Sequence, residues 1–273
     1  MKIKTLMAMV GLVQMTARAT EALDIVIANP VPVKVLVRDG RPIVDGVYVN
    51  GHGPYRFLID TGTNVNLIQA RLAQSIGLMP TFRTELATSA GVTIVFGKDE
   101  NEVVLSSVKA DRQKFLFTGL EAIQERWPDV CGVLGQWFLS RFDYTLNLRG
   151  KWLEFGKLNR SGTRARITII NARPAVATSL GSLVLDSGAA RLILFGVERH
   201  DSSAFNIELR TLSGSQIIGA VSGKRLLIEG RKIWDGDAVA VPNHPEPGVD
   251  GLLPLGLFKS IYFCNSEDYV VFE

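Results

Sequence analysis

The sequence is poor in the side chains that most often bind metals or cross-link small folds. Its 273 residues include only two cysteines, Cys131 and Cys264, and three histidines, which are isolated from one another and from the cysteines. Such spacing fits no metal site, and no cofactor is expected. One disulfide is conceivable in an exported protein, but both cysteines lie among apolar residues, where free thiols are common. The pairing of the cysteines stays open at this stage.

Long hydrophobic runs and a strong charge of one sign are also missing. The only notable apolar run outside the predicted strands, residues 6–13, is too short for a permanent membrane anchor. After removal of residues 1–22, 27 basic side chains face 26 acidic ones, a net charge of +1. Near neutrality gives no reason to expect nucleic acid or an anionic membrane as a partner, and we expect no stable membrane insertion.

The N-terminus has the order of features found in a secretory signal peptide. Lys2 and Lys4 precede the apolar run, and small residues follow at 17–19 and 20–22, at the spacing that a signal peptidase accepts. We therefore predict a signal peptide over residues 1–22 and an exported protein, periplasmic or secreted. A buried N-terminal helix is the alternative.

Strand signals dominate the rest of the chain. Residues 31–37, 42–49 and 55–60 are rich in β-branched and aromatic side chains, and turns at 38–41 and 50–53 contain Asp-Gly and Asn-Gly. One helix is predicted over 68–76, with Gly77 at its C-terminal end, and a short one after Gly135. With 47% hydrophobic residues, the chain has enough apolar material for a sizeable, mostly β core.

The chain also repeats itself in a fixed order. An apolar strand ends in Asp-Thr-Gly at 60–62, and another ends in Asp-Ser-Gly at 186–188. Each is followed by an apolar stretch beginning with glycine, 132–138 in one half and 251–258 in the other, and then by an aromatic hairpin. The aspartates stand 126 residues apart and the glycines 119. We predict two related lobes, 23–160 and 161–273, joined by the polar, basic stretch 156–166.

The repeated motif has a chemical interpretation. A carboxylate at the end of a buried strand needs a partner, and the following glycine lets another backbone approach closely. If a pseudo-twofold axis relates the lobes, Asp60 and Asp186 meet and share one proton. One carboxylate can then act as a base on water while the other, protonated, polarises a peptide carbonyl.

These motifs resemble those of the bacterial retropepsin-like aspartic peptidases. The resemblance rests on residues 50–62 for the first family motif and on 131–144 and 250–263 for the second, and it spans roughly residues 43–273. It implies an all-β, pepsin-like fold of two lobes around a cleft. It also implies that Asp60 and Asp186 are catalytic. Four neighbouring residues would have supporting roles: Thr61 and Ser187 would brace the lobes, and Gly62 and Gly188 would permit the close approach.

Two departures from an exact repeat suggest unequal lobes. Pro254 stands where the first lobe has Gly135, so the loop supporting Asp186 is expected to differ. Thr63 follows the first motif and Ala189 the second, and a hydroxyl at this position can lower the pKa of the nearby aspartate.

A flap over the cleft is expected, since excluding water favours the chemistry. The candidate in the first lobe is 84–95, with Ser89, Ala90 and Gly91 at its tip, and the candidate in the second lobe is 210–224. An ordinary surface hairpin is the alternative for both.

The predicted function is hydrolysis of peptide bonds in an extended polypeptide by an aspartic endopeptidase that acts as a monomer. The alternative is a non-catalytic module that binds peptide or carbohydrate on the same fold. The sequence does not indicate the cleavage specificity, the natural substrate or the pH optimum, nor whether a segment such as 23–33 must be removed first.

Overall fold

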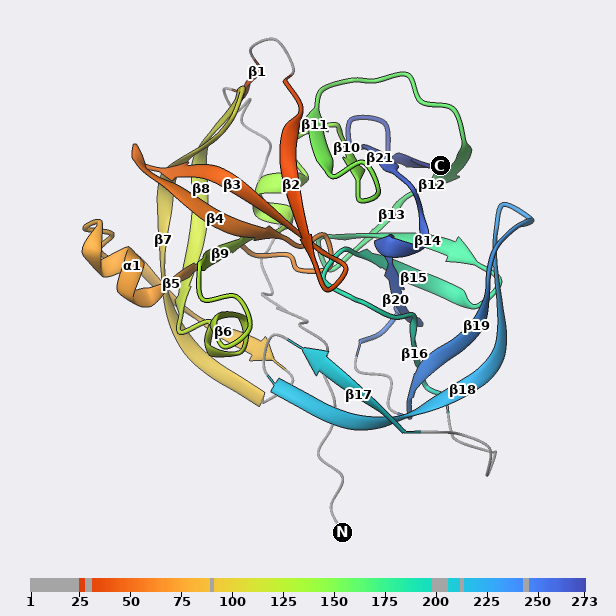
Figure 1. Cartoon of the computed structure of the whole chain (residues 1–273). Helices are drawn as coiled ribbons and strands as arrows, with labels where there is room; N and C mark the ends of the chain where they lie inside the picture. Colours follow the sequence, from red (N-terminus) through yellow and green to blue (C-terminus); the bar gives the residue numbers. More distant parts are fainter. Residues whose placement is uncertain (1–24, 28–30, 89–90, 198–205, 212–213, 243–245) are drawn as a thin grey trace.

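The chain forms two sheets with few helices. The computed structural model describes residues 25–27, 31–88, 91–197, 206–211, 214–242 and 246–273. Within these ranges one sheet has 14 strands and the other has eight (Figure 1). Short helices interrupt the strands: α1 (Ala70–Ser75), α2 (Glu121–Gln124), α3 (Gln136–Leu139) and a 3-10 turn at Leu255–Leu257. The predicted mostly β fold is confirmed.

Each lobe is built on eight strands in the same spatial order. The first lobe has β2 (Val33–Arg38), β3 (Arg41–Val49), β4 (His52–Ile59), β9 (Val130–Leu134), β5 (Leu67–Gln69), β8 (Val108–Thr118), β7 (Gly91–Leu105) and β6 (Phe82–Thr88). The second has β13 (Thr168–Ile170), β14 (Arg173–Thr178), β15 (Gly181–Asp186), β20 (Gly251–Pro254), β16 (Ile193–Phe195), β19 (Arg231–Val241), β18 (Gly214–Ile228) and β17 (Asn206–Thr211). The β4–β9 and β5–β8 pairs are parallel, as are β15–β20 and β16–β19, and the other neighbours are antiparallel. The internal repeat predicted from the sequence is therefore confirmed.

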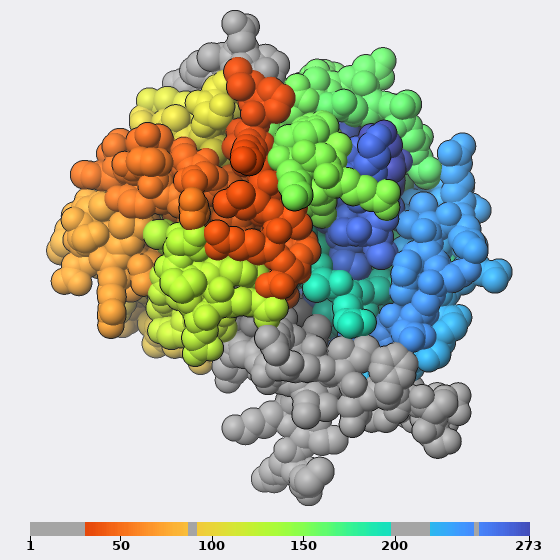
Figure 2. Space-filling model, viewed as in Figure 1, coloured from red at the N-terminus to blue at the C-terminus, as the bar shows by residue number. Residues whose placement is uncertain are grey.

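Five further strands join the lobes. The large sheet continues from β2 through β11 (Trp152–Phe155), β10 (Tyr144–Asn147), β21 (Ile261–Cys264) and β22 (Tyr269–Phe272) to β12 (Thr163–Arg166). Strands β10 and β21 are antiparallel neighbours, with Tyr144 opposite Phe263. Figure 2 shows the lobes side by side, the first in red to yellow-green and the second in teal to blue. The lobe boundary at residues 160 and 161 stays a prediction. Outside this strand order, β1 (Ile25–Ile27) pairs with β8.

Aromatic side chains fill the core where the lobes meet. Phe142 packs between Phe138 and Phe155, with ring centroids 5.1 Å from each. Tyr144 stacks on Phe263 across the β10–β21 pair at 4.7 Å. All five side chains are buried, and burying one large apolar side chain stabilises a fold by roughly 1.5–3 kcal/mol. The two lobes therefore share one hydrophobic core.

The structure shifts one predicted element and leaves another outside its range. The helix predicted over 68–76 begins only at Ala70, because Leu67 and Ile68 pair with β8 and β9 as strand β5. The short helix predicted after Gly135 is confirmed as α3. The predicted signal peptide, residues 1–22, lies outside the described residues. Both cysteines are free thiols. In the described part of the chain, no helix has the length and apolar character needed to cross a membrane.

Candidate active site

The two motif aspartates lie at the ends of corresponding strands. Asp60 directly follows β4, and Asp186 is the last residue of β15. Each strand is paired in parallel with a second buried strand, β9 or β20. Inner strands of this kind are buried on both faces, so their sequences are continuously apolar. Residues 57–59 and 183–185 have this pattern. Both carboxyls are buried, with 3% of Asp60 and 8% of Asp186 exposed.

The residues after the aspartates bridge the lobes through reciprocal hydrogen bonds. The Thr61 hydroxyl donates to the Leu185 carbonyl oxygen at 2.7 Å and accepts from the Ser187 amide at 3.0 Å. The Ser187 hydroxyl donates to the Ile59 oxygen at 2.7 Å and accepts from the Thr61 amide at 3.0 Å. Each hydroxyl is thus both donor and acceptor across the interface. This bridge fixes the two strand ends relative to each other.

The Thr61→Val substitution tests the bridge. Valine keeps the shape of threonine but leaves the Leu185 oxygen and the Ser187 amide without their partner. Each buried unsatisfied group costs about 1–3 kcal/mol, so we expect the free energy of unfolding to fall by roughly 2–5 kcal/mol. Chemical denaturation measures this loss. Thr168→Val, at an exposed position of β13, is the matched control and should leave stability nearly unchanged. Equal stabilities of the two variants would contradict the assigned role.

The two motif glycines place each aspartate against the opposite lobe. A Cβ atom at Gly188 would lie 2.8 Å from Asp60 Oδ2, and one at Gly62 would lie 2.6 Å from Asp186 Oδ1. Real Cβ atoms do not approach other atoms so closely, so only glycine fits either position. The sequence-based expectation that these glycines permit a close approach agrees with this geometry. The structure brings Asp60, Thr61, Gly62, Asp186, Ser187 and Gly188 together at one point.

Burial raises the pKa of both carboxyls, and repulsion by Asp186 raises that of Asp60 further. Burial raises the pKa of Asp60 most, the negative charge of Asp186 adds to this, and the pKa reaches about 8. Burial is also the main reason that the pKa of Asp186 is raised. Amide donors act in the opposite sense: Gly62 donates to Asp60 at 2.9 Å, while Gly188 and Ala189 donate to Asp186 at 2.7 and 2.9 Å. Asp186 therefore has one amide donor more than Asp60.

The two aspartates are unequal, but the Thr63 hydroxyl is not the cause that the sequence led us to expect. The Thr63 hydroxyl is buried and makes no hydrogen bond within the described residues, so it does not lower the pKa of Asp60. The inequality comes instead from the backbone amide of Ala189. The other departure, Pro254 in place of Gly135, does change the supporting loop. The Gly135 amide donates to Asn66 Oδ1 at 3.0 Å, and Pro254 has no amide hydrogen to donate.

Two buried arginines complete the pair of motifs, one from each lobe. Arg41 Nε donates to the Gly188 oxygen at 2.7 Å, and Arg173 Nη1 donates to the Gly62 oxygen at 3.3 Å. Each arginine thus holds the motif glycine of the other lobe. The positive charge of Arg41 lowers the pKa of both aspartates, and that of Arg173 lowers the pKa of Asp186.

The two arginines occupy equivalent positions but have different surroundings. Arg173 is 1% exposed and forms an ion pair with Glu246, which is also buried and accepts from the Asn171 amide. The Arg41 guanidinium lies 5.7 Å from the centre of the Trp127 ring. The second lobe therefore places a buried ion pair behind Gly62 of the first lobe, and the first lobe places a cation–π contact behind Gly188 of the second.

Our sequence analysis missed these arginines, although a signal was present. Each is followed by proline and begins the strand after a two-residue turn, Asp39-Gly40 or Asn171-Ala172. All four turn residues have positive φ. Such turns connect hairpin strands, so the paired Arg-Pro steps are a third element of the repeat.

The hairpins predicted as flaps are present. Strands β6 and β7 pair from Phe82–Gly97 to Thr88–Gly91, and Ser89 and Ala90 of the predicted tip lie outside the described residues, while Gly91 begins β7. Strands β17 and β18 form the equivalent hairpin. On β7, the alternate residues Val92, Ile94 and Phe96 are 55–66% exposed. One face of this hairpin therefore carries an uncovered apolar stripe.

Two comparisons with known proteins return matches to aspartic proteases. Residues 46–141 match the family described as "gag-polyprotein putative aspartyl protease". The chain is also similar to the crystal structure of a retropepsin-like aspartic protease from Rickettsia conorii, with 18% identity, 50% of this chain and 96% of that one covered, and a TM-score of 0.36. A comparison with curated proteins finds no match. The family match covers about a third of the chain and lies in its first lobe.

Proposed function

We propose that the protein is an aspartic endopeptidase that hydrolyses peptide bonds with a water molecule activated between Asp60 and Asp186. The observation that supports this most is the buried carboxyl pair, in which each side chain contacts the motif glycine of the other lobe. Two carboxyls held this close keep one proton between them, which provides an acid and a base at the same place. One chain supplies both aspartates, so we also propose that it acts as a monomer.

The unequal surroundings suggest which carboxyl holds the proton. Asp186 accepts two amide hydrogens and lies near two arginines, whereas Asp60 accepts one and lies near one. The ionised form is therefore better stabilised at Asp186, and the proton rests mainly on Asp60.

The reaction then follows from these two protonation states. Asp186 takes a proton from water as the water oxygen attacks the peptide carbonyl carbon. Asp60 donates a hydrogen bond, then its proton, to the carbonyl oxygen. As the tetrahedral intermediate collapses, the C=O bond re-forms and the C–N bond breaks. Asp186 gives its proton to the leaving nitrogen and a hydroxyl of the intermediate returns a proton to Asp60, so the carboxyl pair ends with the single proton it began with.

The uncovered stripe on β7 supports an extended polypeptide as the substrate. Val92, Ile94 and Phe96 are every second residue of β7 and lie on one face of the hairpin. A neighbouring strand presents its side chains to one face with the same two-residue period. A strand-like peptide bound by its main chain would place alternate apolar side chains against this stripe.

The pH dependence of hydrolysis should be bell-shaped, because only the singly protonated pair has both an acid and a base. Loss of the last proton is governed by the raised pKa of Asp60, about 8, so activity should decline through the mildly alkaline range. Protonation of Asp186 should reduce activity on the acid side, beginning at a higher pH than for an ordinary aspartate, because its pKa is also raised. Measurement of kcat/KM for a peptide between pH 3 and 10 tests this. Constant activity across the alkaline range would contradict the proposed proton donor.

Export of the protein is a separate proposal, supported by the basic start, the short apolar run and the small residues within 1–22. We expect the mature chain to begin near residue 20 or 23 and to occur in the cell envelope or the medium. N-terminal sequencing of the protein from fractionated cells measures this directly. A cytoplasmic protein that still begins at Met1 would disprove export.

A further inference from the structure

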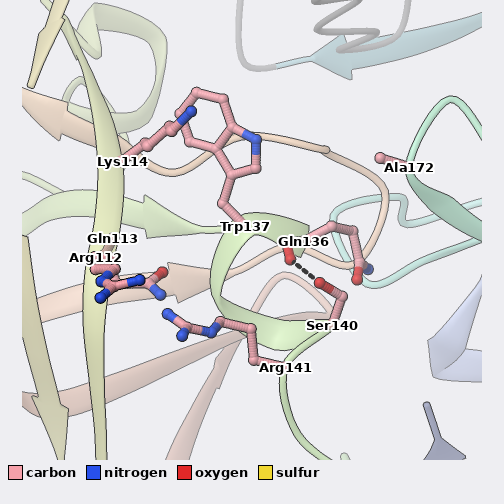
Figure 3. A pocket seen from close by; sticks show the side chains of 8 residues that line it. All are labelled: Arg112, Gln113, Lys114, Gln136, Trp137, Ser140, Arg141 and Ala172. Atoms are coloured by element: carbon pink, nitrogen blue, oxygen red, sulfur yellow. Dashed lines mark hydrogen bonds between the residues drawn. The ribbon is translucent and has the colours of Figure 1, made fainter. Parts of the chain in front are cut away.

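Gln136 opens α3, and its buried side chain lies behind the loop that carries Asp60. Only 3% of Gln136 is exposed. Figure 3 shows it in the wall of a pocket, where the Ser140 hydroxyl donates to its backbone oxygen at 2.5 Å. Its side chain points away from the guanidinium groups of Arg112 and Arg141, which line the same pocket. A buried amide side chain needs hydrogen-bond partners, so the partner that Gln136 reaches indicates what it does.

The Gln136 side chain holds the peptide unit whose other end binds Asp60. Gln136 Nε2 donates to the Thr61 carbonyl oxygen at 2.8 Å. The amide hydrogen of the same peptide unit belongs to Gly62, and it donates to Asp60 Oδ1 at 2.9 Å. Because a peptide unit is planar, fixing the direction of its carbonyl also fixes the direction of its amide. Gln136, the peptide between residues 61 and 62, and Asp60 therefore form one chain of two hydrogen bonds.

Two hydrogen bonds in such a chain strengthen each other. A donor at the carbonyl end polarises the peptide unit, which makes the amide at the other end a better donor, and this effect is larger in a buried site than in water. Burial has the largest influence on the pKa of Asp60 and raises it, whereas the hydrogen bond from the Gly62 amide lowers it. Gln136 therefore strengthens, through one peptide unit, a contact that stabilises the ionised form of Asp60.

Asp186 is bound in the same way, with a donor from another part of the chain. Arg41 Nε donates to the Gly188 carbonyl oxygen at 2.7 Å. The amide of that peptide unit belongs to Ala189 and donates to Asp186 Oδ1 at 2.9 Å. Each aspartate thus accepts from a peptide unit whose carbonyl end is held by a buried side chain. The two donors come from different elements, α3 and β3, so the arrangement recurs although its parts do not.

The second lobe also shows that packing at this position does not need an amide side chain. Leu255 follows Pro254 there, as Gln136 follows Gly135 in the first lobe, and Leu255 is fully buried. Leucine fills the space after the buried strand but has no donor. A buried glutamine at the corresponding place must find a partner for its amide, since an unsatisfied buried group destabilises the fold. The Gln136 amide therefore contributes something that the packing of the lobe does not require.

We propose that Gln136 is a positioning residue that orients the Gly62 amide toward Asp60 and thereby keeps this carboxyl ready to release its proton. The proposal rests on the proposed function, because the proton in question is the one that Asp60 gives to the substrate carbonyl. Gln136 acts only through the peptide between residues 61 and 62 and does not touch the reacting atoms. Its effect on the rate comes from orientation, since a misplacement of about 1 Å can slow a reaction a hundredfold.

Gln136→Met tests the proposal, because methionine is unbranched like glutamine but has no donor. We expect the alkaline limb of kcat/KM to move to higher pH by roughly 0.2–0.6 pH unit, since a weaker Gly62 donor raises the pKa of Asp60. We expect kcat to fall by about three- to tenfold through the looser orientation of Asp60, with KM nearly unchanged. Gln136→Leu copies the residue of the second lobe, should act in the same direction, and serves if the methionine variant does not fold.

Gln124→Met is the matched control. Gln124 of α2 also donates from its side-chain amide to a backbone oxygen, that of Val130 at 3.3 Å, and it accepts from Gln69 at 2.6 Å. Neither bond involves residues 60–66. This variant should lose stability, as Gln136→Met does, but keep the kcat and the pH profile of the wild type. Equal shifts of the alkaline limb in the two variants, or no shift in Gln136→Met, would overturn the proposal.

The pH dependence of stability gives a second measurement that needs no substrate. In the wild type the free energy of unfolding falls as the pH rises to about 8, because the folded state holds the Asp60 proton more tightly than the unfolded state does. In Gln136→Met this fall should continue to higher pH. The other charged groups around the pair, Asp186, Arg41 and Arg173, remain in place in this variant.

The two measurements distinguish failure of this proposal from failure of the proposed function. A wild type that hydrolyses no peptide would refute the proposed function, and the stability profile would still decide whether Gln136 acts on Asp60. A stability profile that has the same pH dependence in the wild type, Gln136→Met and Gln124→Met would refute the role of Gln136, even in an active peptidase.

Discussion

Peptide hydrolysis is expected to disappear when either Asp60 or Asp186 is replaced by asparagine. Asparagine keeps the shape of the side chain but can neither hold nor release the shared proton. We expect kcat/KM to fall by at least about a thousandfold for each single variant, and the double variant to be little worse, because residues that act as one unit are not additive. Asp45→Asn, at an exposed position, is the matched control and should retain full activity.

The same variants give a second result that does not depend on a substrate. The raised pKa of Asp60 means that the folded state binds its proton more tightly than the unfolded state between the ordinary value of 3.8 and about 8. The free energy of unfolding of the wild type therefore falls as the pH rises through this range. Asp60→Asn has no such group, so its stability relative to the wild type should increase from pH 4 to pH 8. Denaturation at several pH values measures this.

Together the two results separate the possible outcomes. Loss of hydrolysis with the predicted stability change supports the coupled pair. A folded variant that keeps near wild-type hydrolysis would place the chemistry elsewhere. A wild type that binds peptides without cutting them at any pH would favour a binding module on this fold.

The buried ion pair between Arg173 and Glu246 should be the most sensitive charged contact of the second lobe. Both side chains are at most 2% exposed, and the pair lies directly behind Gly62. Removing one partner from such a pair leaves an uncompensated buried charge, which costs about 3–5 kcal/mol. We expect a loss of this size for Arg173→Met and for Glu246→Gln. The double variant Arg173→Met with Glu246→Leu should be less destabilised than either single variant, because no buried charge remains.

The surface pair of Arg225 and Asp235, with a nitrogen–oxygen distance of 3.2 Å, supplies the control. Asp235→Asn should change stability little, since exposed ion pairs contribute little to stability.

The pH profile of hydrolysis distinguishes an electrostatic role of Arg173 from a purely structural one. Arg173→Met should move the acid limb of hydrolysis to higher pH, because the positive charge of Arg173 lowers the pKa of Asp186. Glu246→Gln retains that charge and should not move the limb upward. Identical profiles of the two variants would argue against an electrostatic role.

The repeat of the sequence predicted most of the architecture. Asp-Thr-Gly and Asp-Ser-Gly, each at the end of an apolar strand, indicated paired lobes, because the buried strand and the close approach are local requirements that residue types reveal. The hydrogen bonds of Thr61 and Ser187 could be anticipated in kind, since a buried hydroxyl needs a partner. Which oxygen each hydroxyl reaches depends on the register between the lobes, and no local pattern contains that information.

The features that escaped prediction depend on distant parts of the chain. Ile68 has the spacing of a helix with Leu72 and Ile76, yet it pairs as a strand together with Leu67, because β8 and β9 provide open edges on both sides of them. Arg41 and Arg173 look like surface residues beside turns, and only the opposite lobe buries them. The hydrogen bond from the Ala189 backbone amide could not be predicted from side-chain types. This amide, and not the Thr63 hydroxyl, makes the two aspartates unequal.

The strands that join the lobes also determine when this chain can fold. Strand β10 of the first lobe pairs with β21, and β22 lies between β21 and β12, so the joining part of the large sheet is completed only by residues 261–272. During synthesis these residues emerge more than a hundred residues after β10, which has an unpaired edge until they do. Contacts between residues so far apart in sequence form slowly. A nascent chain that lacks residues 261–272 therefore contains both aspartates but not the strands that complete the joining part of the sheet.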